Sequence, residues 1–99
     1  MNKSTDTVVH SFSRDLPKKN LSLKALKRST MEKAGGRFRL LDSGKIAVYW
    51  RELGFMELIH QVAVYEPSSR FLRPDRMELV LSNEFDDSEL AVSYFEALS

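Results

Sequence analysis

The chain has 99 residues, a formal net charge of +1 and no cysteine, which excludes disulfides, thiolate nucleophiles and zinc or iron–sulfur sites held by cysteine. Its composition, 42% hydrophobic and 29% charged, is typical of one soluble globular domain. The longest apolar runs fall far short of the ~20 residues that cross a bilayer, and the N-terminus has no apolar block resembling a signal peptide. We therefore expect a cytoplasmic protein that does not associate with membranes.

The charges are divided unevenly along the chain. Residues 1–39 carry ten Lys and Arg against three acids, a net charge of +7, whereas residues 40–99 carry five against eleven, a net charge of −6. Such asymmetry indicates a polyanionic partner for the basic half, because Lys and Arg that meet phosphates release condensed counterions. The alternative is that the two halves fold against each other and partly neutralise.

The chain begins with a polar stretch. Residues 1–20 are rich in Ser, Thr, Lys and Asn, which predicts a flexible N-terminal arm before a single domain over 21–99. Within the arm, Val8, Phe12 and Leu16 recur every four residues, the spacing of a helix. The arm is therefore expected either to become ordered on a partner or to lie on the domain.

A first helix is predicted over residues 21–34. Asn20 or Ser22 is expected to cap its start, and Gly35-Gly36 to end it. Its apolar arc is thin, so we expect it to pack at the periphery of the domain. A second arc is basic and is expected to face water or a partner: Lys24, Lys27 and Arg28.

Residues 35–55 have two interpretations. In the first, strands over 37–41 and 45–52 form a hairpin that turns at Asp42-Ser43-Gly44, since these are turn residues and Val48-Tyr49-Trp50 is β-prone. In the second, residues 44–53 form an amphipathic helix. We interpret the stretch as a hairpin; a helix here would make the order of elements similar to that of a winged helix.

Two further strands are predicted over 55–65 and 76–82. The first has apolar residues on both faces, which indicates a central strand. The intervening loop of about ten residues offers no crossover helix, so we expect the two strands to pair antiparallel. With the hairpin before them they make a small antiparallel sheet.

The C-terminal helix is predicted over residues 87–98. Asp86 and Glu89 have the spacing of a capping box, and acids at this end favour the positive end of the helix dipole. The apolar arc includes Tyr94 and Leu98 and is wide enough to need burial in the core or in an interface. The fold class is therefore α+β, an antiparallel sheet flanked by this helix and the N-terminal one.

Patterns for catalysis or metal binding are incomplete, so we expect a protein that is not an enzyme and has no cofactor or metal. A phosphate-binding loop fails because Arg39 and Ile46 stand where the motif needs its first Gly and its hydroxyl residue. Residues 83–89 are acid-rich but lack the Gly and the final Glu of a calcium-binding loop. His60 alternates with apolar neighbours, and we interpret it as a hydrogen-bonded residue of a sheet rather than a general base.

Basic residues with aromatic neighbours favour a regulatory or accessory protein that contacts nucleic-acid phosphates. Arg37 and Arg39 share one side of the predicted strand and are expected to extend the basic arc of the first helix. Arginines on the loop after residue 68 suit phosphate recognition as well. The predicted phosphate contacts are Lys18, Lys19, Lys24, Lys27, Arg28, Arg37, Arg39, Arg70 and Arg73.

The alternative hypothesis is a protein-binding adaptor or inhibitor that docks on a larger protein assembly. Its acidic C-terminal segment and its apolar C-terminal helix would then meet a basic or apolar partner surface. The wide apolar arc of that helix also permits a homodimer. The predicted interface residues are Asp86, Asp87, Glu89, Tyr94 and Leu98.

Overall fold

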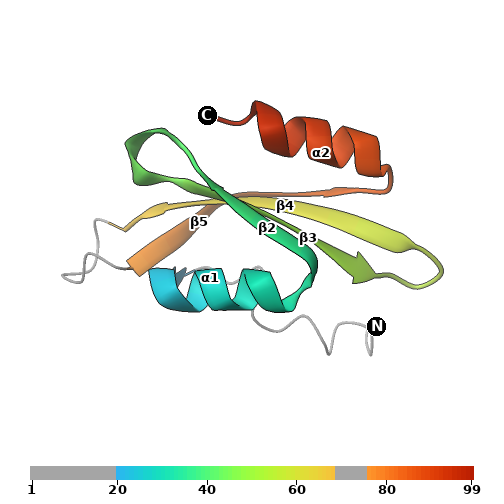
Figure 1. Cartoon of the computed structure of the whole chain (residues 1–99), viewed down its shortest axis with the longest axis horizontal. Helices are drawn as coiled ribbons and strands as arrows, with labels where there is room; N and C mark the ends of the chain where they lie inside the picture. Colours follow the sequence, from blue (N-terminus) through green and yellow to red (C-terminus); the bar gives the residue numbers. More distant parts are fainter. Residues whose placement is uncertain (1–19, 69–75) are drawn as a thin grey trace.

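The computed structural model describes residues 20–68 and 76–99. In chain order these form β1 (Asn20–Ser22), α1 (Leu23–Glu32), β2 (Ala34–Leu40), the 3₁₀ turn η2 (Asp42–Gly44), β3 (Ile46–Leu53), β4 (Leu58–Pro67), β5 (Arg76–Phe85) and α2 (Ser88–Ala97). The strands make one curved antiparallel sheet in the order β1-β5-β4-β3-β2, with α1 on one face and α2 on the other (Figure 1). The predicted α+β class is confirmed.

Strand β3 is buried on both of its faces. Five consecutive residues, Ile46 to Trp50, are shielded from solvent, as are six consecutive residues of β4, His60 to Tyr65. Side chains alternate between the faces of a strand, so such runs need a covering layer on each side of the sheet. The two helices supply these layers.

The core therefore consists of two hydrophobic clusters separated by the sheet. On the α1 side, Leu26 and Trp50 are fully buried among side chains of β1, β3, β4 and β5. On the α2 side, Ala91 and Phe95 pack against β3 and β4. Burying a side chain such as Leu26 contributes about 1.5–3 kcal/mol, so both helices are held by their apolar contacts with the sheet.

The hairpin interpretation of residues 35–55 is confirmed, and the winged-helix alternative is wrong. Residues 46–53 are a strand whose register pairs Phe38 with Val48 and Ala47 with Val64. The helical spacing of apolar residues here is a consequence of burial on both faces, which gives a strand an almost continuous apolar run. Asp42–Gly44 makes the turn, where Ser43 and Gly44 have positive φ.

The predicted helix over 21–34 is too long at both ends. Residues 20–22 form the short strand β1, and Ser22, one of the two expected caps, accepts a hydrogen bond from the Ala25 N–H at 3.1 Å. The helix ends at Glu32 because Lys33 is extended, and the Gly35-Gly36 pair lies inside β2 at an irregularity of the ladder rather than at a helix end.

Two other boundaries differ from the prediction. The first residues of the predicted strand 55–65 are loop, and β4 begins at Leu58. Helix α2 is capped by Asp87 rather than Asp86: the Asp87 carboxylate accepts hydrogen bonds from the N–H groups of the two residues at positions 89 and 90, at 2.8 and 3.4 Å. Strand β5 continues to Phe85 and so includes part of the acidic segment.

Neither α1 nor α2, the helices found within the described ranges, is long and apolar enough to cross a bilayer.

Gly36 marks the tightest approach between α1 and β2. Its N–H donates to the Lys33 carbonyl at 3.1 Å, and a Cβ built at this position would overlap the Thr30 carbonyl oxygen at the end of α1. The neighbouring atom belongs to the backbone and cannot swing away. A side chain at position 36 must therefore separate the helix from the strand that follows it.

We expect Gly36→Ala to lower the free energy of unfolding by about 1–3 kcal/mol, the cost of overpacking at a site that cannot relax freely. Urea unfolding followed by circular dichroism measures it. The control is Lys24→Ala on the exposed side of α1, which is expected to change stability by less than about 0.5 kcal/mol. Equal unfolding midpoints for Gly36→Ala and the unmodified chain would contradict the close approach.

Candidate functional site

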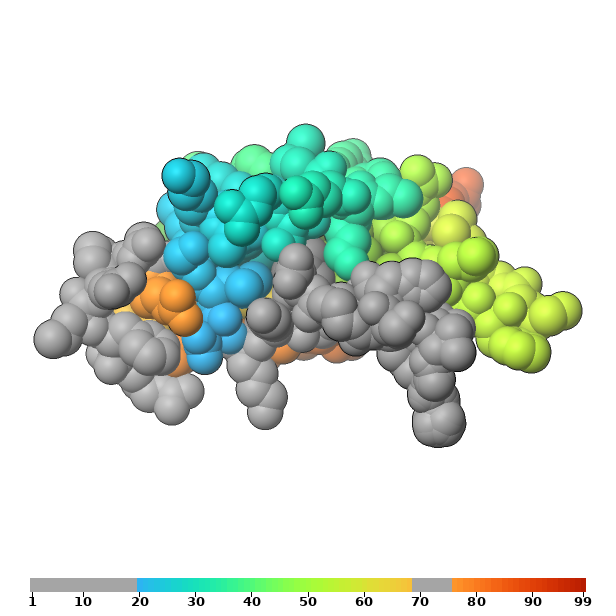
Figure 2. Space-filling view, turned by 90° about the horizontal axis from the view of Figure 1, so that it is seen from below, coloured from blue at the N-terminus to red at the C-terminus, as the bar shows by residue number. Residues whose placement is uncertain are grey.

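The β3–β4 hairpin ends in a tight, well-defined loop. The ladder runs to its last pair, Leu53 with Leu58, and the Gly54 N–H donates to the Glu57 carbonyl at 2.6 Å. Phe55 and Met56 therefore occupy the tip of the turn. Figure 2 shows this yellow-green part of the chain projecting at one end of the molecule.

The side chains of this loop are apolar and exposed. Leu53, Phe55, Met56 and Leu58 have 68%, 89%, 82% and 43% of their surface in contact with solvent, and we call them the apolar tip. Turn positions usually carry Gly, or a residue such as Asn, Asp or Ser whose polar group can hydrogen-bond to the local backbone or to water. Contiguous exposed apolar side chains on a small protein are typical of a contact surface.

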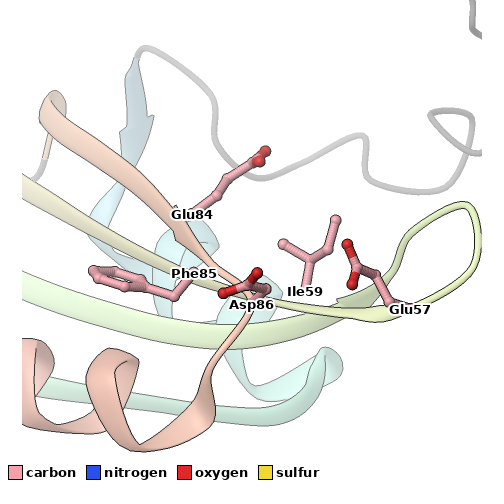
Figure 3. A pocket seen from close by; sticks show the side chains of 5 residues that line it. All are labelled: Glu57, Ile59, Glu84, Phe85 and Asp86. Carbon is pink, nitrogen blue, oxygen red and sulfur yellow. The ribbon is translucent and has the colours of Figure 1, made fainter.

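An acidic groove adjoins the apolar tip at Glu57. Glu57 from the loop, Glu84 from the end of β5 and Asp86 directly after it lie around Ile59, and with Phe85 they line an open groove of about 360 Å³ (Figure 3). We call this the acidic groove. Of its carboxylates, Glu84 accepts a hydrogen bond from the neighbouring Gln61 amide at 3.3 Å. The groove thus places negative charge beside an apolar surface.

A second charged surface lies on α1. Lys24, Lys27 and Arg28 are all exposed on the outer side of the helix, as the sequence predicts, and we call them the basic face. Lys27 Nζ lies 5.6 Å from the centre of the Phe38 ring on β2, and 37% of the Phe38 side chain is exposed. An aromatic ring therefore lies next to the cations.

Arg37 and Arg39 do not extend the basic face, in contrast to the prediction. They alternate with Phe38 along β2 and so lie on the α2 side of the sheet. The Arg37 guanidinium stacks 5.3 Å from the centres of both the Tyr49 and Phe95 rings. The sheet separates these two arginines from the three cations of α1.

Arg39 instead holds the C-terminal end of α2. Its Nη1 donates to the carbonyl oxygens of Phe95 and Leu98 at 2.6 and 3.0 Å. Carbonyls at a helix end have no partner within the helix and carry partial negative charge, so a guanidinium there is stabilising. This contact joins the edge strand β2 to the helix.

The predicted interface residues of α2 divide into two groups. The apolar arc of the helix faces the sheet, where the Tyr94 ring packs 5.3 Å from that of Phe85, and its hydroxyl accepts from the Asn83 amide at 2.9 Å. Leu98 also packs against the α2-side cluster, so the core uses much of the apolar arc, while Leu90 is 60% exposed. Asp86, Asp87 and Glu89 remain exposed, and Asp86 belongs to the acidic groove.

Four predicted phosphate contacts, Lys18, Lys19, Arg70 and Arg73, lie outside the described residues.

His60 is a hydrogen-bonded residue of the sheet. Its Nδ1 lies 2.9 Å from the Tyr49 hydroxyl, and only 6% of its surface is exposed. Across residues 20–68 and 76–99, no three His, Asp or Glu side chains come together in a way that suits a metal ion.

The apolar tip is not predicted from the sequence, where Phe55 and Met56 fall in a predicted central strand because apolar residues occupy both of its faces. The available signal was Gly54, which breaks the apolar pattern between two strands and is followed by large apolar residues where a turn normally has polar ones.

Comparisons with known proteins add nothing to this geometry: no family model matches the chain, and no curated protein or solved structure is detectably similar to it.

We expect Arg39→Met to lower the free energy of unfolding by about 1–2 kcal/mol, because two hydrogen bonds from a charged donor to the end of α2 are lost. Amide hydrogen exchange should show the loss of protection concentrated in the last turn of α2. Arg28→Met is the matched control, since it makes the same chemical change on the exposed side of α1. Equal protection of α2 in the two variants would contradict the anchoring role of Arg39.

Proposed function

We propose that the protein is a small protein-binding adaptor or inhibitor that docks through the apolar tip and the acidic groove. The observation that carries this proposal is the exposure of Phe55 and Met56, 89% and 82%, at the end of a hairpin held by backbone hydrogen bonds. A preformed loop loses little conformational entropy on binding, so apolar contacts made there count almost fully toward affinity.

The charges of the acidic groove indicate the chemistry of the partner. The groove adjoins the apolar tip at Glu57 and continues to Glu84 and Asp86, so a partner that carries Lys or Arg next to apolar side chains would gain both burial and opposite charge. A second copy docking tip to tip would bring the carboxylates of both copies together. An anionic membrane would be repelled by the same groups.

We therefore take the partner to be a protein segment with apolar side chains flanked by cations. Its apolar side chains would cover Phe55 and Met56, and a Lys or Arg would enter the acidic groove over Ile59. Aromatic and apolar anchors at the centre of an interface carry most of its binding energy, while charges at its rim mainly set partner choice and the rate of association.

Selection of random-sequence peptides displayed on phage against the purified chain tests this proposal. The selected peptides are expected to contain aromatic or aliphatic residues flanked by Lys or Arg. For these peptides, Phe55→Ser with Met56→Ser should weaken binding at least about 30-fold, the loss typical of hot-spot residues. The affinities can be measured by isothermal titration calorimetry.

The matched control is Leu40→Ser with Val80→Ser, which removes two other exposed apolar side chains, 74% and 53% exposed, at the end of the sheet opposite the tip. It should leave peptide affinity unchanged. Glu57→Lys with Asp86→Lys is expected to abolish binding of the same peptides. Peptides that bind the tip variant as tightly as the unmodified chain, or that carry no excess of Lys and Arg, would refute the proposal.

A further inference from the structure

The basic face of α1 is the strongest feature that the proposed docking surface does not use. Lys24, Lys27 and Arg28 follow one another at helical spacing on the exposed side of the helix, and Glu32 is the one acid within α1 itself. Four residues of helix span about 6 Å, so the three cations form a compact cluster. All three cations face solvent rather than the core.

Apolar side chains lie beside these cations. Phe38 touches Lys27 through its ring face, and Leu40, two residues further along the same side of β2, is 74% exposed. Met31, one turn after Lys27 on α1, is 63% exposed. None of these three side chains belongs to the α1-side core cluster, although Phe38 is partly covered through its contact with Lys27.

We infer that this surface binds single-stranded nucleic acid, with the basic face on the phosphates and Phe38 as a platform for a base. Cations that follow a backbone next to an exposed aromatic ring are the combination by which proteins bind single strands without reading sequence. A duplex keeps its bases stacked on each other and would leave Phe38 and Leu40 without a contact. The inference concerns a different surface from the apolar tip and does not depend on the proposed function.

Arg37 and Arg39 are not part of this site. Their contacts with Phe95 and with the end of α2 hold them on the opposite side of the sheet. The number of cations is therefore small, and the salt dependence should be modest. With three phosphate contacts, the logarithm of the binding constant should fall with the logarithm of salt concentration with a slope of about −2 for a single strand.

The experiment is fluorescence anisotropy of labelled oligothymidylate and of a labelled duplex of the same length over a series of salt concentrations. The full chain should bind the single strand more tightly than the duplex, with the slope given above. Lys24→Gln with Lys27→Gln and Arg28→Gln should abolish the salt-dependent binding. Phe38→Leu, which keeps an apolar side chain but removes the ring, should weaken single-strand binding at least about 5-fold and leave the slope unchanged.

A matched variant controls for net charge. Ser88→Glu with Ser93→Glu and Ala97→Glu lowers the charge by the same three units on exposed positions of α2, across the sheet from α1, and should retain most of the single-strand affinity. The tip variant Phe55→Ser with Met56→Ser should bind the oligonucleotide as the unmodified chain does. Circular dichroism checks that every variant is folded.

Three outcomes would overturn the inference. The first is the absence of binding to either nucleic acid at low salt. The second is equal affinity for single strand and duplex together with an unchanged affinity of the Phe38→Leu variant. That result would show a general contact with polyanions rather than stacking of a base on Phe38. The third is binding to vesicles that contain anionic lipid without binding to oligonucleotides, since a basic and apolar surface then serves a membrane.

Discussion

The burial of Ile46 to Trp50 on both faces of β3 is the constraint on which the rest of the structure depends. A strand of this kind is stable only if each face of the sheet is covered. The chain has two helices in its described part, and each is committed to one face by a buried anchor, Leu26 in α1 and Phe95 in α2. The apolar side chains that anchor each helix are therefore unavailable to a partner, although Met31 of α1 and Leu90 of α2 remain exposed. The side of α1 that faces away from the sheet carries most of its charged residues, which explains why its cations are exposed as a group.

The lengths of the elements explain where apolar surface is left over. Each helix has ten residues and spans about 15 Å, whereas a strand of ten residues such as β4 spans about 33 Å. Helices of this length cannot cover the whole sheet, so the end of the β3–β4 hairpin extends beyond them (Figure 1). The turn positions at that end have no covering layer, and polar residues could occupy them at no cost to the stability of the fold. That Phe55 and Met56 occupy them instead is a property the fold does not require, and such a property points to contact with another molecule.

Whether a feature of this protein can be predicted from the sequence depends on how far apart in the chain the residues that determine it lie. The turn at Asp42–Gly44, the cap at Ser22 and the antiparallel pairing of β4 with β5 follow from short-range patterns and are as expected. Strand β1 and the end of α1 are not, because both depend on a distant partner: β1 exists through its pairing with the first residues of β5. The side of the sheet on which Arg37 lies also depends on a distant partner. Alternation along β2 predicts that it shares a side with Arg39, but not which side, since that is fixed by α2 packing near the other end of the chain.

The opposite charges of the two halves of the sequence meet on one side of the folded molecule. Ile59, four residues before Ala63 on β4, points to the same face of the sheet, and Ala63 belongs to the α1-side cluster, so the acidic groove opens on the same side of the sheet as α1. The basic face and the acidic groove therefore lie on one side of the molecule with opposite sign. A polyanion drawn to α1 is repelled near Glu57 and Glu84, and a basic segment drawn to the groove is repelled near Lys24 and Arg28. Each surface repels the ligand that suits the other. A substitution that abolishes one of the two proposed interactions should therefore leave the other in place.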